Sequence, residues 1–255
     1  MLLSSRSNPK IKHLRALQQR KTRQKFKQFI VEGSGLIQDA LHAGFKLLSI
    51  YGTDSTILFD ASETFYLSPE LMSYVSSLES ASDVLGVFEF KEPLEDSNRY
   101  SAWVLAERLQ DPGNAGALLR LVDACGWRGV LALDGFPDIY SPKVIRASMG
   151  SCFRVPVKHL DLESLKQLQQ DNWTLLATTL DAENTSMNCD LPDKLLLAVG
   201  NEGQGLSLSL IEISQARVKI PLYGSIDSLN VVTATAMLMH EYLRQQTQRN
   251  NLPCL

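Results

Sequence analysis

The sequence predicts an α/β protein of two domains, the second built on a parallel sheet with helices on both faces. Three observations predict this fold. Short apolar segments of strand length alternate with segments of helical periodicity along most of the 255 residues. A polar stretch at 94–100 separates the two halves and is expected to be a linker. With 44% hydrophobic and 21% charged residues, the composition excludes disordered, collagen-like and coiled-coil chains.

Residues 1–93 are expected to form the smaller domain. Apolar side chains at helical spacing predict a helix within 10–28, and 29–33 have the pattern of a strand that ends in a turn. A helix is predicted at 36–43, where Gly44 would end it. Further strands are predicted at 47–51, 63–67 and 84–90.

Residues 101–255 are expected to form the second domain. Strands are predicted at 102–106, 129–133, 155–157, 173–179, 195–199 and 216–221. Helices are predicted at 115–125, after Ser141, at 161–170, at 207–214 and from Ser228 to about 249. Ser141 and Pro142 form a typical helix start, with serine as the N-cap and proline in the first turn. Because strands and helices alternate throughout, the sheet is expected to be parallel.

Charge is unevenly distributed along the chain. Residues 1–31 contain nine basic and no acidic side chains, whereas the remaining residues contain 16 basic and 28 acidic ones. This asymmetry indicates a polyanion-binding end, although a solvated basic helix without a partner is an alternative. The basic residues expected to contact the polyanion are Arg6, Lys10, Lys12, Arg15, Arg20, Lys21 and Arg23.

Cysteine and histidine spacing predicts neither disulfides nor a metal site. The four cysteines and the four histidines are scattered and form no ligand pattern, so no metal is expected. No apolar run approaches the ~20 residues that a membrane span needs, and the first residues lack the apolar core of a signal peptide. The protein is therefore expected to be cytoplasmic.

Three loops of the second half carry unusual residues at positions where ligands bind parallel sheets. The first loop includes Asn114, near the start of a helix, and Arg120, inside that helix. The second follows an apolar strand and contains three glycines around Glu202, without the pattern of a phosphate loop. The third contains Ser228 and Asn230. Taken singly, each also fits a capped helix or a tight turn.

Together and in this order, the loops resemble the three motifs of the SpoU/TrmH branch of the SPOUT RNA methyltransferases. The N-x-G-A-x-x-R motif is Asn114 to Arg120, G-N-E-G-x-G-L is Gly200 to Leu206, and I-P-x-x-G-x-x-x-S-L-N-V is Ile220 to Val231. Residues 1–93 resemble, less specifically, an L30e-like RNA substrate-binding domain. The resemblance implies a SPOUT-type parallel sheet with a C-terminal deep trefoil knot and a homodimer.

The resemblance also implies transfer of a methyl group from S-adenosylmethionine to a ribose 2′-hydroxyl of structured RNA. The implied cofactor-binding residues are Thr178, Gly200, Gly203, Ile220 and Leu229, and the implied catalytic residues are Asn114, Arg120, Glu202, Ser228 and Asn230. Arg120 would meet the phosphate and 2′-hydroxyl of the reacting nucleotide. Glu202, as a buried carboxylate, would hold Asn114 and Arg120. Either Arg120 or a phosphate oxygen that it positions would accept the proton.

Ribosomal RNA of the 23S type is the expected substrate, because the separate N-terminal domain resembles rRNA-acting members. Transfer RNA is the first alternative. A catalytically silent RNA-binding or ribosome assembly protein is the second, but the complete set of polar motif residues speaks against it. An NAD-dependent enzyme on an ordinary Rossmann sheet is the third, but the chain lacks a phosphate loop near the first strand of that sheet.

Overall fold

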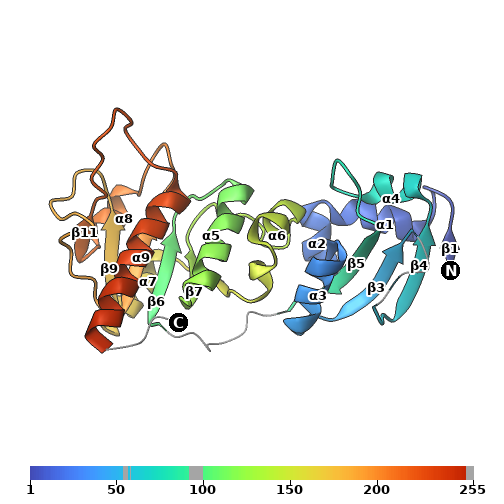
Figure 1. Cartoon of the computed structure of the whole chain (residues 1–255), viewed down its shortest axis with the longest axis horizontal. Coiled ribbons are helices and arrows are strands. Elements are labelled where there is room, and N and C mark those ends of the chain that lie inside the picture. The colour runs from blue at the N-terminus through green and yellow to red at the C-terminus, as the bar shows by residue number, and fades with distance from the viewer. Residues whose placement is uncertain (54–56, 58, 92–99, 251–255) are drawn as a thin grey trace. The chain divides into compact units, whose positions relative to one another are not determined.

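The computed structural model describes residues 1–53, 57, 59–91 and 100–250 (Figure 1). Its contacts divide the chain into two compact units. The N-terminal unit holds Met1–Glu92 together with Asp138–Arg154, and the second unit holds Pro93–Pro137 with Val155–Leu255. These units differ from the predicted domain ranges because Asp138–Arg154 was expected in the second domain. The predicted linker lies, apart from Tyr100, outside the described residues.

The N-terminal unit is built on a five-stranded mixed sheet in the order β1–β4–β3–β5–β2. β3 pairs in parallel with β4, and β5 pairs antiparallel with both β3 and β2. The sequence predicts four of these strands within one residue but not β1, which pairs with β4 at the sheet edge. The strands are β1 (Leu2–Leu3), β2 (Gln28–Glu32), β3 (Leu47–Gly52), β4 (Glu63–Leu67) and β5 (Val84–Glu89).

Four helices come from the first part of this unit. They are α1 (Pro9–Leu17), α2 (Arg20–Phe26), α3 (Ser34–His42) and α4 (Pro69–Val75). The helical structure predicted within 10–28 is present as two helices, because the chain breaks between α1 and α2 and Lys27, with φ 54°, ends α2. Apolar residues of α1 and α4, among them Leu14 and Met72, pack together over the sheet in one core cluster.

Arg23 explains the break and corrects one prediction. Its Nη1 donates to the carbonyl oxygens of Leu17 at 2.9 Å and Gln18 at 2.8 Å, which are terminal acceptors of α1. Its Nη2 pairs with Asp138 at 2.7 Å. Arg23 is only 3% exposed. The expectation that it contacts RNA phosphates is therefore wrong in this structure, since its guanidinium is used internally.

The segment Asp138–Arg154 completes the N-terminal unit with α6 (Pro142–Ser148) and the 3₁₀ turn η1 (Ser151–Phe153). The Tyr140 ring stacks on Phe29 of β2 with centroids 4.4 Å apart, and its hydroxyl donates to the carbonyl oxygen of Lys91 at 3.0 Å. The segment is thus held by an aromatic stack, a buried ion pair and a hydrogen bond. As predicted, Ser141 caps α6.

The second unit is built on a six-stranded sheet in the order β11–β9–β10–β6–β7–β8, with every neighbouring pair parallel. The predicted parallel sheet is confirmed. The prediction for β8 is displaced by two residues, and the other strands lie within their predicted ranges. The strands are β6 (Ala102–Ala106), β7 (Gly129–Ala132), β8 (Val157–His159), β9 (Thr174–Thr178), β10 (Leu195–Val199) and β11 (Ala216–Val218).

Helices cover both faces of this sheet. On one face, α7 (Leu162–Gln170) and α8 (Leu208–Glu212) bury Leu165 and Leu210 against Trp103 and Leu105 of β6. Consecutive strand residues point to opposite faces, so the alternate residues meet α5 (Pro112–Ala124) and α9 (Val231–Asn250). These two helices lie side by side in front of the strands in Figure 1 and contact each other.

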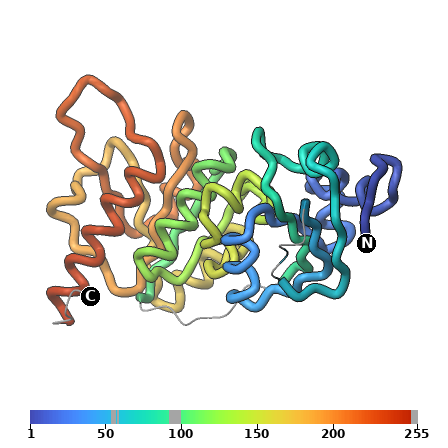
Figure 2. Tube along the Cα trace, turned by 45° about the vertical axis from the view of Figure 1, so that its right-hand side comes forward, coloured from blue at the N-terminus to red at the C-terminus, as the bar shows by residue number. Residues whose placement is uncertain are grey.

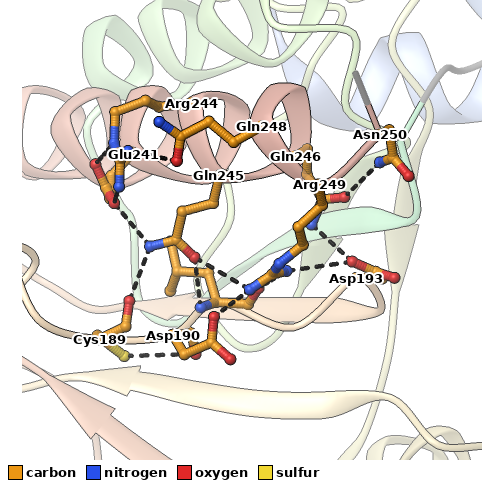
Figure 3. A network of polar contacts seen from close by, with 11 residues as sticks. Cys189, Asp190, Asp193, Glu241, Arg244, Gln245, Gln246, Gln248, Arg249 and Asn250 are labelled. Carbon is orange, nitrogen blue, oxygen red and sulfur yellow. Dashed lines mark hydrogen bonds and ion pairs between the residues drawn. The ribbon is translucent and has the colours of Figure 1, made fainter. Parts of the chain in front are cut away.

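A polar network fastens the connection between β9 and β10 to the end of α9 (Figure 3). Arg249 donates to the carbonyl oxygen of Leu191 at 2.6 Å and pairs with Asp190 and, at 3.3 Å, with Asp193. Gln245 accepts a hydrogen bond from Leu191 N at 2.8 Å. Side chains of the last helical turns therefore hold this irregular segment and satisfy both backbone polar groups of Leu191.

Candidate active site

A cavity of about 420 Å³ opens at the carboxyl ends of β9, β10 and β11. This volume lies within the range of roughly 300–1,000 Å³ that small-molecule sites occupy. The Thr178 hydroxyl donates to the carbonyl oxygen of Ala198 at 2.9 Å, so this side chain forms part of the wall. The lining includes all five residues that the resemblance assigns to the cofactor, namely Thr178, Gly200, Gly203, Ile220 and Leu229.

The glycine loop 200–205 folds back on itself at the cavity. Gly205 N donates to the carbonyl oxygen of Asn201 at 2.8 Å, and Asn201 Oδ1 accepts from Gly203 N at 2.9 Å. A Cβ on Gly200 would lie 2.4 Å from the carbonyl carbon of Gly205. The returning loop therefore occupies the space in which a side chain at position 200 would lie, so this position requires glycine.

Two charged residues that sequence reasoning missed support this loop. Glu107, 8% exposed after β6, accepts hydrogen bonds from Ser207 N at 2.6 Å and Ser207 Oγ at 2.7 Å. Arg108 donates to Gln204 Oε1 at 3.1 Å and to the carbonyl oxygen of Gly205 at 3.2 Å. The available signal was a Glu-Arg pair directly after a fully apolar strand, at the end of the sheet where ligands bind.

Three predicted catalytic residues from three loops meet beside the cavity. Asn230 Nδ2 donates to Glu202 Oε1 at 2.6 Å and to Asn114 Oδ1 at 3.1 Å. Asn114 Nδ2 donates to the same Glu202 oxygen at 3.0 Å. Glu202 also lines the cavity. One carboxylate oxygen therefore fixes two amide side chains at the cavity rim, and we call these three residues the polar trio.

Two members of the trio lie at the starts of helices. Asp111 caps α5, because its Oδ1 accepts from Asn114 N at 2.8 Å. Asn230, not Ser228, precedes α9, and its Oδ1 accepts from the backbone N of Val232 at 2.9 Å. The final helix accordingly begins at Val231 rather than at Ser228. Asn230 thus starts a helix with its oxygen and joins the polar trio with its nitrogen.

The remaining two predicted catalytic residues, Ser228 and Arg120, form no hydrogen bond with the polar trio. Ser228 is exposed and lines the cavity. Arg120 is exposed on α5, and no hydrogen bond or ion pair joins it to another residue that the structure describes. The expectation of a buried Glu202 that holds Arg120 is wrong, since Glu202 is exposed and its partners are the two asparagines.

The basic residues predicted to bind RNA fall into three groups in the N-terminal unit. Arg23 is buried, as described above. Lys10 forms an ion pair with Glu63 at 2.7 Å. The guanidinium groups of Arg6 and Arg15 lie 4.6 and 5.0 Å from the centroid of the Tyr74 ring. The other exposed cations of the predicted set are Lys12, Arg20 and Lys21.

In the described residues, no three His, Cys, Asp or Glu side chains gather as a possible metal site. Within the same residues, no helix is long and apolar enough to cross a membrane. Of the four cysteines, Cys125, Cys152 and Cys189 are free thiols and Cys254 lies outside the described part.

Sequence comparison identifies both halves of the chain. The profile of the SpoU rRNA methylase family matches residues 101–240, and that of the MRM3-like substrate-binding domain matches 8–86. The 23S rRNA (guanosine(2553)-2′-O)-methyltransferase of Bacillus subtilis (strain 168) is 30% identical over 243 residues. That alignment covers 93% of this chain and 97% of the Bacillus protein.

Solved structures extend the likeness to the whole fold. The AdoMet-bound rRNA methyltransferase from Sinorhizobium meliloti matches with a TM-score of 0.85 and 28% identity, covering 99% of each chain. An RNA 2′-O ribose methyltransferase matches with a TM-score of 0.83 and 33% identity, covering 96% of this chain and 99% of that one. As its three motifs predict, the chain belongs to the SpoU rRNA methylase family.

Proposed function

We propose that this protein transfers the methyl group of S-adenosylmethionine to a ribose 2′-hydroxyl of 23S-type ribosomal RNA. The observation that carries the proposal is the meeting of the glycine loop and the polar trio at the rim of one cavity. The name of the Bacillus relative specifies 23S rRNA, and the Sinorhizobium structure is titled as AdoMet-bound. These names favour ribosomal over transfer RNA.

The residues of the cavity fit S-adenosylmethionine. Ile220 and Leu229 offer apolar surface to an adenine ring, and the glycine loop offers backbone groups to the polar parts of the cofactor. When bound, the cofactor supplies a methyl group that its sulfonium already activates. The protein must then align a ribose oxygen with that methyl group and provide for one proton.

Three residues would share that task. Arg120 would bind the phosphate and 2′-hydroxyl of the target nucleotide, since it is exposed and its planar guanidinium carries several N–H donors. Glu202 would hold the amides of Asn114 and Asn230 toward the site. Ser228 would donate near the methionine end of the cofactor. Either Arg120 or a phosphate oxygen that it positions would accept the proton.

The proposal includes the deep trefoil knot and the homodimer that the family resemblance implies, and a cytoplasmic site of action. Contacts of the β9–β10 connection support the knot. Ser186 N donates to the carbonyl oxygen of Lys219 at 2.8 Å, and Arg249 of α9 donates to Leu191. One connection is therefore bonded both to the segment after β11 and to the helix that would thread with it.

The test is methyl transfer from radiolabelled S-adenosylmethionine to unmodified 23S rRNA and, separately, to tRNA transcripts. We expect label in rRNA in alkali-resistant linkages, the mark of a 2′-O-methyl group. Arg120→Ala should abolish transfer while the cofactor Kd changes less than about threefold, which corresponds to under 1 kcal/mol. Label in tRNA alone would keep the chemistry and change the substrate. Absence of cofactor binding would overturn the proposal.

A further inference from the structure

Tyr223 is the most solvent-exposed large apolar residue in the part of the chain that the structure describes. The residue is 88% exposed, whereas the only other exposed Phe, Tyr or Trp of that part, Phe26, is 46% exposed. No hydrogen bond or ring contact joins Tyr223 to another described residue. Tyrosine is amphipathic and usually covers its ring against another surface, so this ring is placed to meet a ligand or partner.

The ring belongs to the loop that borders the cavity. Its neighbour Leu222 lines the cavity, and the chain returns to the lining at Ser228 and Leu229. Because consecutive Cα atoms lie about 3.8 Å apart, the Tyr223 side chain starts next to the cavity wall. Between β11 and α9 the loop projects beyond the rest of its unit in both views (Figures 1 and 2).

Proteins that recognise structured RNA commonly target single-stranded loops and bulges, whose unstacked bases stack on aromatic side chains. We infer that Tyr223 forms a stacking site for the base of the target nucleotide, with Ile226, 58% exposed, on the same loop as a second apolar contact. This inference rests on the proposed function. Stacking tolerates all bases, so Tyr223 would position the nucleotide rather than identify its base.

The surroundings of the ring favour RNA over a second protein chain. Between Tyr223 and the polar trio the loop exposes Ser225, Asp227 and Ser228 as well as Ile226. Along the loop, the two apolar side chains are therefore separated by polar residues and glycine and form no apolar run of the kind that is typical at the centre of protein interfaces. An isolated ring beside hydrogen-bonding groups suits one unstacked base, whose face is apolar and whose edge is polar.

Three variants test the site on the RNA transcript that accepts label. Tyr223→Ala should lower kcat/KM for RNA about 10- to 100-fold, the range for loss of one base–aromatic stack, mainly through a higher KM. Tyr223→Phe keeps the ring and should restore at least half of the activity. Leu208→Ala removes a 77% exposed apolar side chain of the same unit that does not line the cavity, and should behave as wild type. The cofactor Kd, measured by calorimetry, should be unchanged in all three.

Each contrary result has a distinct meaning. An active wild type with an equally active Tyr223→Ala variant would overturn the stacking site and leave the proposed function intact. Loss of cofactor affinity in Tyr223→Ala would also overturn it, by making the ring part of the cofactor site. A lower mass of Tyr223→Ala in sedimentation would assign the ring to a contact between copies instead. A wild type that binds cofactor but labels no RNA would refute the proposed function and the stacking site together.

Discussion

At the residue scale, Asn230 links folding to the site because one side chain performs two tasks. Its oxygen accepts hydrogen bonds from the first backbone N–H groups of α9, and its nitrogen donates to Glu202 and Asn114. The two tasks use opposite ends of the amide. They can therefore be separated by replacing the nitrogen while keeping the oxygen.

Asn230→Asp is predicted to keep stability and lose activity. Aspartate caps helices as well as asparagine does, so the melting temperature should stay within about 2 °C of wild type. A second carboxylate beside Glu202 removes the shared donor, and methyl transfer should fall roughly 10- to 100-fold. Asn230→Ala loses the cap as well and should also melt ~2–4 °C lower. Calorimetry and the methyl-transfer assay measure both effects, and full activity of Asn230→Asp would contradict the role of the polar trio.

The sequence predicts the members of the polar trio but not their contacts. Motif order places Asn114, Glu202 and Asn230 at one edge of a sheet, and the structure joins them across 88 and 116 residues of sequence. Glu107 and Arg23 show what such reasoning misses. A carboxylate after a strand and an arginine among basic residues have no sequence mark of burial. Their roles depend on partners, Ser207 and Asp138, that folding brings to them.

At the element scale, two arginines of α9 differ in their contacts, because Arg249 makes a tertiary contact and Arg244 a local one. Arg249 joins α9 to the β9–β10 connection, whereas Arg244 pairs with Glu241 three residues earlier on the same helix. Arg249→Ala should cost about 1 kcal/mol, discounted because the side chain is 34% exposed, and lower the melting temperature by ~2–4 °C. Arg244→Ala should cost under ~0.5 kcal/mol.

Hydrogen exchange gives the matched readout for these two variants. Amides of 184–193 should exchange faster in Arg249→Ala and at the wild-type rate in Arg244→Ala, because of these two arginines only Arg249 contacts that connection (Figure 3). Equal protection of the connection in both variants would mean that backbone contacts with Lys219, rather than Arg249, hold it.

The sequence predicts the elements of the second unit more accurately than those of the N-terminal unit. A buried parallel strand is an uninterrupted apolar run, as in β6 and β10, and so it stands out from its flanks. α4 was missed although Ser68 and Pro69 give it the same start that was recognised at α6. The two-residue strand β1 is too short to show the alternation of apolar and polar residues that identifies a strand. The break between α1 and α2 depends on a side chain, Arg23, and not on a glycine or proline.

At the scale of the whole molecule, a buried tyrosine in each unit links stability to pH. Burial raises the pKa of Tyr140 in the N-terminal unit to about 12 and also raises the pKa of Tyr242 in the second unit. An unfolded tyrosine ionises near pH 10, so between those values the unfolded state has fewer bound protons than the folded state. The contribution of the two tyrosines to the free energy of unfolding should then be constant below about pH 9 and fall as the pH rises through 10 to 12.

Urea unfolding at pH 8, 10 and 11 tests this dependence. All three tryptophans, Trp103, Trp127 and Trp173, lie in the second unit, so their fluorescence follows that unit and circular dichroism follows both. Between pH 10 and 11, the free energy of unfolding that fluorescence reports should fall less steeply in Tyr242→Phe than in wild type, by up to about 1.4 kcal/mol per pH unit. Tyr140→Phe should leave this slope unchanged. The same slope in Tyr242→Phe and wild type would rule out this tyrosine as the origin.

The charge asymmetry of the whole chain gives the last prediction, that RNA binding weakens steeply with salt. Of the nine cations in residues 1–31, Arg23 and Lys10 have internal acidic partners. The seven that are exposed are Arg6, Lys12, Arg15, Arg20, Lys21, Lys25 and Lys27. Each phosphate contact adds ~0.7–0.9 to the slope of log K against log salt concentration. The double variant Arg20→Gln/Lys21→Gln should therefore reduce that slope by about 1.5, without changing the cofactor Kd.

The control is the double variant Lys166→Gln/Lys194→Gln. It removes the same charge from exposed positions of the acidic second unit and should leave the slope as it is. Equal effects of the two double variants would mean that net charge, rather than the basic end, attracts the RNA.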